Sequence, residues 1–109
     1  MVKRGDLYLV KKPGGGDPKR QRVFVVVSHQ GLLDTSYSTV ICAPVYSNYH
    51  GIKTQVLVGQ DEGLKAESAI HCDNLASIPR KALTDHKGTL SIEKLRHLDE
   101  ALAVALGLR

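Results

Sequence analysis

The sequence contains no tryptophan and a single phenylalanine, so aromatic residues make up only 5% of its 109 positions. Proteins that hold single-stranded nucleic acid without sequence preference stack bases on several aromatic side chains. The scarcity of aromatic residues therefore argues against a broad stacking surface. Long apolar runs are also missing, because no stretch approaches the ~20 residues that span a membrane and the N-terminus lacks a signal-peptide core. We expect a cytoplasmic protein with no membrane partner.

Cysteine is equally sparse. Cys42 and Cys72 stand far apart in apolar runs, without the Cys-x-x-Cys or clustered His/Cys spacing of a structural zinc site. We expect both thiols to be buried apolar side chains in a reducing compartment, while a bridge between them stays open. Internal repeats are absent, and the length suits one core, so we expect a single domain over residues 1–109.

Basic residues outnumber acidic ones, with 15 Lys and Arg against 11 Asp and Glu, which gives a net charge of +4. This balance mildly favours a polyanionic partner such as nucleic acid. Four of the cations fall in residues 11–20, where prolines and glycines predict a loop. The loop lacks the Gly-Lys-Ser/Thr of a phosphate-binding P-loop. It is either a solvated connection or a mobile basic flap over a bound anion.

Short apolar segments between turn residues predict an antiparallel sheet of short strands. The run 23–28 is apolar on both faces of a strand, which places it inside a barrel or sandwich. Pro44 predicts an edge or a bulge near the end of its strand. Residues 29–36 form a turn region, and 60–67 and 81–83 are expected to hold single helical turns. The expected strands are 6–10, 23–28, 39–45, 53–58, 68–73, 75–78 and 85–90.

The C-terminus predicts one helix, over residues 92–106. Ser91 is suited to the N-cap, Glu93 complements the positive end of the helix dipole, and Gly107 is suited to end the helix. An apolar stripe with helical spacing predicts packing against the sheet or a second subunit. Strands followed by a late helix predict a small, strongly bent antiparallel β-barrel capped by a helix. The stripe consists of Ile92, Leu95, Leu98, Leu102, Ala105 and Leu106.

Two places in this fold carry candidate chemistry. Arg22 stands at the mouth of the buried strand 23–28, where its guanidinium could bind two phosphate oxygens or simply cover the strand end. In the strand 68–73, period-two alternation puts His71 and Asp73 on one face. His71 is therefore either a base or acid that Asp73 orients, or an ordinary histidine of the sheet.

Seven segments, in this order and spacing, resemble the MazF/PemK family of toxin endoribonucleases over nearly the whole chain. Each segment alone is a weak signal, whereas the common order is specific. The segments are Arg4-Gly5-Asp6-Leu7-Tyr8, Arg22-Val23-Phe24-Val25-Val26-Val27-Ser28, Thr39-Val40-Ile41-Cys42-Ala43-Pro44-Val45-Tyr46-Ser47, Gly63-Leu64 with Ser68, Gly88-Thr89-Leu90-Ser91, Leu98-Asp99-Glu100-Ala101-Leu102 and Leu106-Gly107-Leu108.

The resemblance implies an SH3-like barrel with a C-terminal helix, of the PemK/CcdB type, assembled as a homodimer. It also implies cleavage of single-stranded RNA at short sequences without metal or other cofactor, and inhibition by a cognate antitoxin protein. The arginine that opens the second strand is catalytic in this family, and Arg22 stands at that position.

The chain departs from the family pattern at several catalytic positions. A threonine usually follows the third strand, whereas Tyr46 stands there with Ser47 as the neighbouring hydroxyl. Val23 replaces the usual proline after the arginine. Some members use an Arg-Cys-Asp pattern on the fifth strand, where this chain has His71-Cys72-Asp73, and they use a first-loop histidine that has no counterpart here.

Metal-free RNA cleavage needs a base for the 2′-hydroxyl, an acid for the leaving 5′-oxygen and a cation for the phosphoryl charge. We expect Arg22 to stabilise that charge, and Tyr46, Ser47, His71 and Asp73 to hold the phosphate or move protons. The RNA-binding candidates are Lys19, Arg20, Asn48, Tyr49 and His50, since cations hold the backbone while amides and aromatics read unstacked bases.

Two other functions remain open from the sequence. The chain could be a non-enzymatic toxin that uses the same barrel to bind and poison a protein, because a fold does not settle a function. It could also be a family member that binds RNA or antitoxin and cuts poorly, given Tyr46 at the threonine position.

Overall fold

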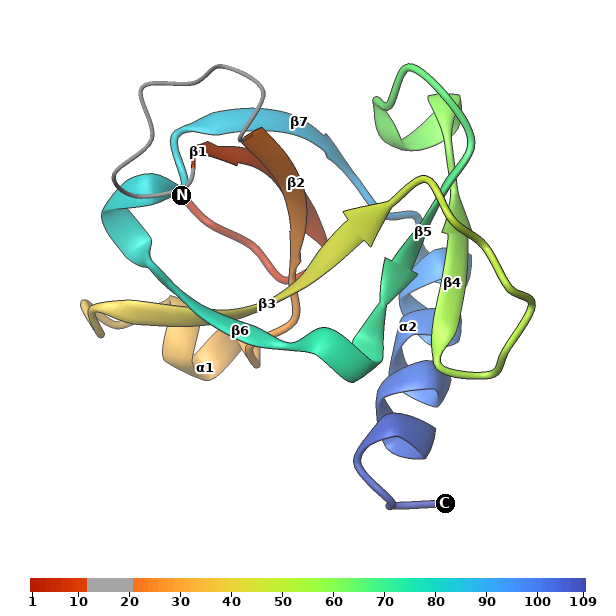
Figure 1. Cartoon of the computed structure of the whole chain (residues 1–109). Coiled ribbons are helices and arrows are strands. Elements are labelled where there is room, and N and C mark those ends of the chain that lie inside the picture. Colours follow the sequence, from red (N-terminus) through yellow and green to blue (C-terminus); the bar gives the residue numbers. More distant parts are fainter. Residues whose placement is uncertain (12–20) are drawn as a thin grey trace.

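Seven short antiparallel strands form one bent sheet, and the chain ends in a helix beside it (Figure 1). The computed structural model describes residues 1–11 and 21–109. The predicted fold, a small bent antiparallel sheet with a C-terminal helix, is confirmed as a half-barrel. The strands are β1 (Asp6–Lys11), β2 (Gln21–Val26), β3 (Thr39–Tyr46), β4 (Gln55–Val58), β5 (Ser68–His71), β6 (Ala76–Pro79) and β7 (Asp85–Thr89).

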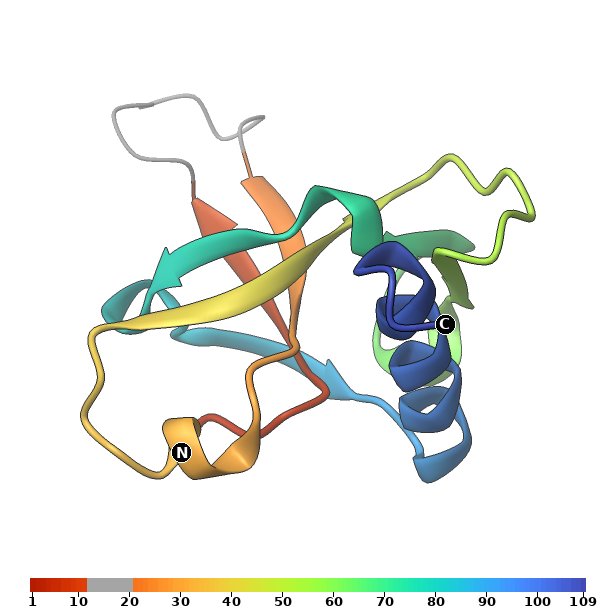
Figure 2. The ribbon, with the colours of Figure 1, turned by 90° about the horizontal axis from the view of Figure 1, so that it is seen from below.

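The helices are short apart from the last one. The α-helices are α1 (Gln30–Leu33) and α2 (Ile92–Ala105), and the 3₁₀ turns are η2 (Gln60–Glu62), η3 (Cys72–Asn74) and η4 (Arg80–Ala82). The turns predicted within 60–67 and 81–83 are therefore present. Figures 1 and 2 show α2 beside β4 and far from α1. No helix in the described part of the chain is long and apolar enough to cross a membrane.

β3 is the strand that joins the two parts of the sheet. The whole order is β4-β5-β3-β2-β1-β7, and β6 pairs with the first half of β3. Pro44 pairs with Phe24 of β2, after the β6 ladder has ended at Cys42 and before the β5 ladder begins at Val45. Of the two predicted alternatives, an edge or a bulge, the edge is therefore wrong. Proline is tolerated in this central strand because it lies where β3 changes partner and one side needs no ladder bond.

β2 is buried on both faces, as its apolar run predicts. Val25 and Val27 belong to a core between the sheet and α2, which includes Ile70 and Leu98. Phe24 and Val26 belong to a second core on the other face. Because successive side chains of a strand point to opposite faces, one apolar run serves both cores.

α2 is capped as predicted and is buried only along its middle. The Ser91 hydroxyl accepts a hydrogen bond from the Lys94 backbone N–H at 3.2 Å, and Gly107, at φ +72°, ends the helix. Leu98 and Ala101 are buried in the core, whereas the first and last residues of the predicted stripe, Ile92 and Leu106, are exposed.

Two segments differ from the sequence-based expectation. The turn region 29–36 contains α1, whose last carbonyl groups accept hydrogen bonds from the Arg80 guanidinium at Leu32 (3.3 Å) and Leu33 (3.1 Å). This distant arginine stabilises a single helical turn that its own sequence does not predict. The strand expected at 68–73 ends at His71, because η3 turns the chain toward β6.

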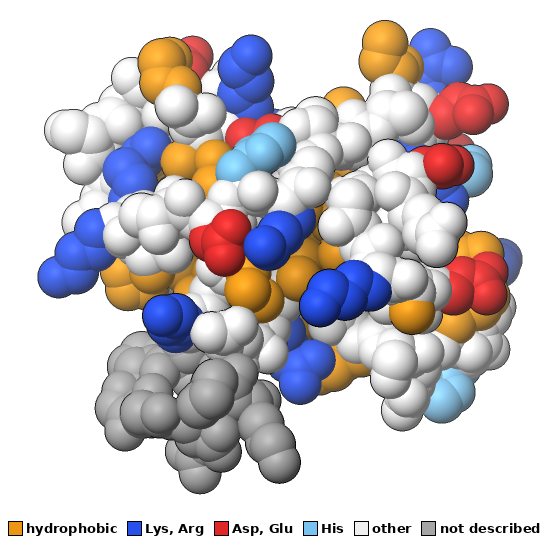
Figure 3. Space-filling model, turned by 90° about the horizontal axis from the view of Figure 1, so that it is seen from above, with side chains coloured by type: hydrophobic (Ala, Val, Ile, Leu, Met, Phe, Trp, Pro, Cys, Tyr) orange, Lys and Arg blue, Asp and Glu red, His pale blue; other side chains and the backbone are white. Residues whose placement is uncertain are grey.

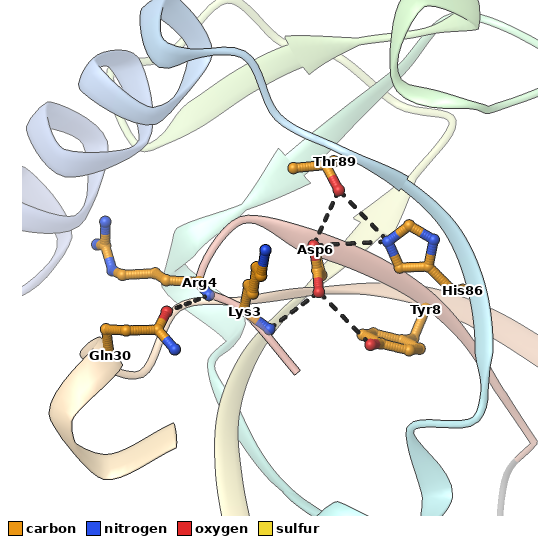
Figure 4. Close-up of polar contacts among 7 residues, drawn as sticks. All are labelled: Lys3, Arg4, Asp6, Tyr8, Gln30, His86 and Thr89. Carbon is orange, nitrogen blue, oxygen red and sulfur yellow. Dashed lines mark hydrogen bonds and ion pairs between the residues drawn. The ribbon is translucent and has the colours of Figure 1, made fainter. Parts of the chain in front are cut away.

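A buried carboxylate fastens β1 to β7 (Figure 4). Asp6 is only 4% exposed, and its oxygens accept hydrogen bonds from the Lys3 backbone N–H and the Thr89 hydroxyl, both at 2.9 Å. His86 Nε2 lies 3.5 Å from the same carboxylate. Burial, with the charge of Asp6 and a hydrogen bond to it, raises the pKa of Tyr8.

Both cysteines are buried free thiols, as predicted. Burial raises the pKa of the Cys42 thiol to about 12. Burial, together with the charge of Asp73, raises the pKa of the Cys72 thiol to about 11. Since the thiolate is the reactive form, both side chains act as small apolar residues at neutral pH.

Two glycines allow the backbones of β7 and η2 to touch. A Cβ on Gly63, which has φ +88°, would lie 2.0 Å from the carbonyl oxygen of Lys87. A Cβ on Gly88 would lie 2.1 Å from the carbonyl oxygen of Glu62. Since backbone atoms cannot move aside as a flexible side chain can, both positions require glycine.

We predict that Gly88→Ala destabilises the protein by about 2–3 kcal/mol, because the added methyl group overpacks a backbone contact. Gly107→Ala is the control, since Gly107 has open space around it, and its positive φ, which Gly88 does not share, should cost only about 1 kcal/mol. Urea unfolding measures both. A Gly88→Ala variant as stable as Gly107→Ala would contradict the close crossing.

Candidate functional site

An open cleft of about 550 Å³ lies between the start of β2, the end of β3 and the segment between η2 and β5. Figure 3 shows the molecule from above, the side on which β7 lies in Figure 1. Lys and Arg side chains lie on this face beside exposed apolar ones. The described residues that line the cleft include three cations and no carboxylate. They are Leu9, Gln21, Arg22, Val23, Val45, Tyr46, Ser47, Gly63, Leu64, Lys65, Ala66, Ser68 and Lys87.

Arg22 lines this cleft and is fixed by two contacts with the end of β3. Its Nη1 donates a hydrogen bond to the Val45 carbonyl oxygen at 3.1 Å. Its guanidinium carbon lies 4.1 Å from the centre of the Tyr46 ring, which is a cation–π contact. One side of the guanidinium is thus held by the protein. Arg22 lies near the start of β2, as its position before the apolar run predicts.

Tyr46 lies between Arg22 and His71. The Tyr46 and His71 rings meet edge to face, with centroids 4.8 Å apart and planes at 82°. Three neighbouring strands, β2, β3 and β5, therefore contribute one side chain each to a continuous row. Ser47 follows Tyr46 into the same cleft, and its hydroxyl lies 3.3 Å from Asn48 Oδ1. The structure thus brings together four of the predicted site residues, Arg22, Tyr46, Ser47 and His71.

Both ring nitrogens of His71 already have partners. Nε2 lies 2.9 Å from the carbonyl oxygen of Asn48, and because a carbonyl only accepts, this nitrogen carries a hydrogen. Nδ1 lies 3.5 Å from the side-chain amide nitrogen of Gln55. The Gln55 amide oxygen in turn accepts from the His50 backbone N–H at 2.8 Å. His71 and Gln55 therefore hold the loop that follows β3.

Gln55 is a site residue that the sequence reasoning missed. The signal for it is the pairing of two neighbouring strands, since Gln55 is directly opposite His71 in the β4–β5 ladder. That register depends on the connection at residues 59–67, whose geometry a strand pattern does not contain. Lys65 and Lys87 were missed as well, because each stands in a short turn or strand with no spacing that marks it as a ligand.

Asp73 does not share a face with His71, contrary to the prediction. The strand alternation stops at His71, and η3 points the carboxylate elsewhere. Asp73 Oδ2 accepts a hydrogen bond from the Thr54 hydroxyl at 2.6 Å. Asp73 therefore fixes the start of β4 and has no contact that would orient the His71 ring.

The predicted RNA-binding residues are scattered. Asn48, Tyr49 and His50 are exposed in the loop after β3, as expected for side chains that meet a ligand. Tyr49 lines a different cleft, between β4 and α2. Lys19 and Arg20 lie outside the described residues.

The fold matches solved toxin structures. It matches the Mycobacterium tuberculosis toxin MazF-mt6 with a TM-score of 0.81 and 23% identity, over 95% of this chain and 98% of that one. It matches an endoribonuclease in complex with its cognate antitoxin, from a mycobacterial species, with a TM-score of 0.84 and 22% identity, over 100% and 98%. A MazE–MazF structure from Deinococcus radiodurans gives 0.76 and 17%, over 97% and 95%.

These likenesses define the class, a mostly-strand half-barrel with a C-terminal helix, and at such identities they show the fold alone. The family follows from the sequence itself. Residues 3–106 match the family described as PemK-like, MazF-like toxin of type II toxin–antitoxin system. The chain belongs to this family, and the resemblance seen in its motifs is confirmed.

We predict a coupling of about 1 kcal/mol between Arg22 and Tyr46 in a double-mutant cycle, from their cation–π contact. Arg22→Met and Tyr46→Leu keep much of each side chain's volume, and urea unfolding gives the free energies. The control cycle pairs Arg22→Met with Tyr37→Leu, since Tyr37 is exposed outside the cleft, and should give no coupling. Equal coupling in both cycles would contradict the contact.

Proposed function

We propose that this toxin is an endoribonuclease that cuts single-stranded RNA at a short sequence, without a metal ion. The observation that carries the proposal is the Arg22 guanidinium, held by the Val45 carbonyl and the Tyr46 ring in a cleft with no carboxylate among its described lining residues. Membership of the PemK-like, MazF-like toxins supports it, and the mycobacterial relative is described as an endoribonuclease.

The reaction uses the nucleophile that the substrate already contains. The ribose 2′-oxygen attacks the adjacent phosphorus, the bond from phosphorus to the 5′-oxygen breaks, and a 2′,3′-cyclic phosphate and a 5′-hydroxyl result. One proton leaves the 2′-hydroxyl and one is delivered to the leaving 5′-oxygen. Negative charge gathers on the two non-bridging oxygens, where a fixed cation stabilises the transition state.

Arg22 is the group we assign to that charge, because its planar fork binds two oxygens and stays protonated. Tyr46 and Ser47 are the hydroxyls beside it, and we assign proton transfer to Tyr46 and phosphate binding to Ser47. His71 acts as a positioning residue, since its nitrogens are engaged and its ring holds Tyr46 edge to face. We assign Asp73 no chemical step.

The proposal includes a cognate antitoxin and a homodimer that work in the cytoplasm. The mycobacterial and Deinococcus relatives are described in complexes with antitoxins, which supports a protein inhibitor here. Two apolar side chains at the C-terminal end of α2, Leu106 and Leu108, are 58% and 73% exposed, which supports a subunit contact at this end of the helix.

We predict that Arg22→Ala lowers cleavage of a long single-stranded RNA by about 10²–10³-fold, the usual cost of a lost oxyanion donor. The assay contains EDTA, and the new ends are sequenced and tested for 2′,3′-cyclic phosphate. Arg22→Lys keeps the charge without the fork and should fall between the wild type and Arg22→Ala.

The alternative of a toxin that poisons a protein gives a different result. If Arg22→Ala still stops growth when expressed without antitoxin, and the purified wild type leaves RNA intact in EDTA, the ribonuclease assignment is wrong.

Tyr46→Phe separates the ring from the hydroxyl. Phenylalanine keeps a ring beneath Arg22, so RNA affinity should stay unchanged while kcat falls about 10²-fold or more from the loss of proton transfer. Single-turnover cleavage over a range of enzyme concentrations measures both values. Full activity in Tyr46→Phe would show that Tyr46 contributes only its ring, and that another group moves the proton.

A further inference from the structure

Among the four clefts described here, the one at Arg22 differs in charge from the rest. The cleft at η2 is lined by Asp61, Glu62 and Glu67 as well as Lys94. Glu100 lines the cleft between β4 and α2, and Asp85 lines the small cleft beside the end of β1. Cations are opposed by at least one carboxylate in those three clefts, and only the Arg22 cleft lacks one among its described lining residues.

Lys65 and Lys87 are the two cations of this cleft that the proposed reaction does not use. We propose that they bind the RNA phosphates that flank the phosphate held by Arg22, and so set how the strand crosses the cleft. The inference rests on the proposed function, because the occupant is chosen by continuity with the Arg22 centre. An RNA strand with one phosphate at Arg22 must run on through the cleft that both lysines line.

The backbone segments that carry the two lysines are closely packed, although the lysine side chains are exposed. Gly63, two residues before Lys65, packs directly against the carbonyl group of Lys87. The η2–β5 segment and β7 therefore cannot separate without breaking a backbone contact. This arrangement holds the two ammonium-bearing segments side by side, which lowers the ordering cost of binding.

Lys87 is already paired in a way that a phosphate can replace. Its Nζ lies 3.3 Å from Asp85 Oδ1, and both side chains are more than a third exposed. An exposed ion pair of this kind contributes little to stability, so exchanging the carboxylate for a phosphate is cheap. Asp85 lines the neighbouring cleft and not this one, so it acts as a competitor for Lys87 and not as a ligand.

The apolar part of the cleft lining suits a nucleobase. Leu9, Val23 and Leu64 are only partly buried, and all three line the cleft. An unstacked base needs an apolar surface and RNA offers bases beside phosphates, whereas an acidic polypeptide offers charge with no planar ring to cover. The combination of cations and apolar side chains in the lining therefore favours RNA over an acidic peptide.

The test measures binding separately from cleavage. The probe is a fluorescein-labelled single-stranded oligonucleotide with 2′-O-methyl riboses, which has no nucleophile and cannot be cut. Anisotropy gives Kd over a series of salt concentrations. We expect Lys65→Ala and Lys87→Ala each to raise Kd several-fold and to reduce the slope of log K against log salt by about 0.7, the value for one lost contact to a single strand.

Three further variants check the assignment. Lys81→Ala removes an exposed lysine of η4 that lines none of the four clefts and should change neither Kd nor slope. Lys87→Arg should restore binding, since the charge returns. Asp85→Asn releases Lys87 and should lower Kd, an effect opposite to that of Lys87→Ala, which a purely structural role for this strand does not produce.

Cleavage of unmodified RNA in EDTA, run in parallel, distinguishes the possible failures. If the wild type cuts RNA while Lys65→Ala and Lys87→Ala bind like the wild type, this inference is overturned and the proposed function stands. If the wild type binds the probe in a lysine-dependent manner and cuts nothing, the phosphate contacts stand and the endoribonuclease is overturned. If poly-glutamate binds as tightly with the same lysine dependence, the RNA assignment of the cleft is wrong.

Discussion

The burial of β2 on both faces is the constraint on which the rest of this structure depends. Its side chains enter two cores at once, one that includes α2 and one beneath α1 and η4. A slip of one residue would exchange the side chains of the two cores, so the pairing of β2 with β1 and β3 is strongly specified. Arg22 stands opposite Val10 in the same ladder, and this register is what brings its guanidinium to the end of β3.

The end of β3 then decides what Arg22 can do. The Val45 carbonyl takes one guanidinium N–H, and the Tyr46 ring supports its face. A threonine at position 46 would offer a hydroxyl without that ring. Tyr46 keeps a hydroxyl and adds an aromatic ring, which contacts the Arg22 guanidinium on one side and a second ring on the other. The second ring is that of His71, which packs edge-on against Tyr46 because β5 pairs with this end of β3.

The sequence predicted the parts of the fold that depend on local pattern. The doubly apolar run around Phe24, the Ser91 cap and the late helix all follow from the spacing of side chains. It did not predict α1, because the Arg80 guanidinium that caps this turn comes from a distant segment. Pro44 was misplaced for a related reason, since only the whole sheet shows where β3 changes partner.

The candidate site divides in the same way. Arg22 and His71 could be chosen from residue type and position along strands, and Tyr46 from its position in the family pattern. Asp73 was given the wrong neighbour, because alternation was carried one turn beyond the end of β5. Gln55, Lys65 and Lys87 could not be chosen, since their relation to the cleft depends on register and on the approach of two connections. A period-two pattern predicts to which face of a strand a side chain points. It does not predict which residue of the neighbouring strand lies beside that side chain.

The close approach of β7 and η2 involves the two segments that bring Lys65 and Lys87 to the cleft. Gly63 and Gly88 allow two backbones to meet where any side chain would separate them. Lys87 precedes one of these glycines and Lys65 follows the other, and both lysines line the cleft. The sequence placed Gly63 in a polar connection and Gly88 in an expected strand, whereas in the structure both glycines let the segments that carry Lys65 and Lys87 meet.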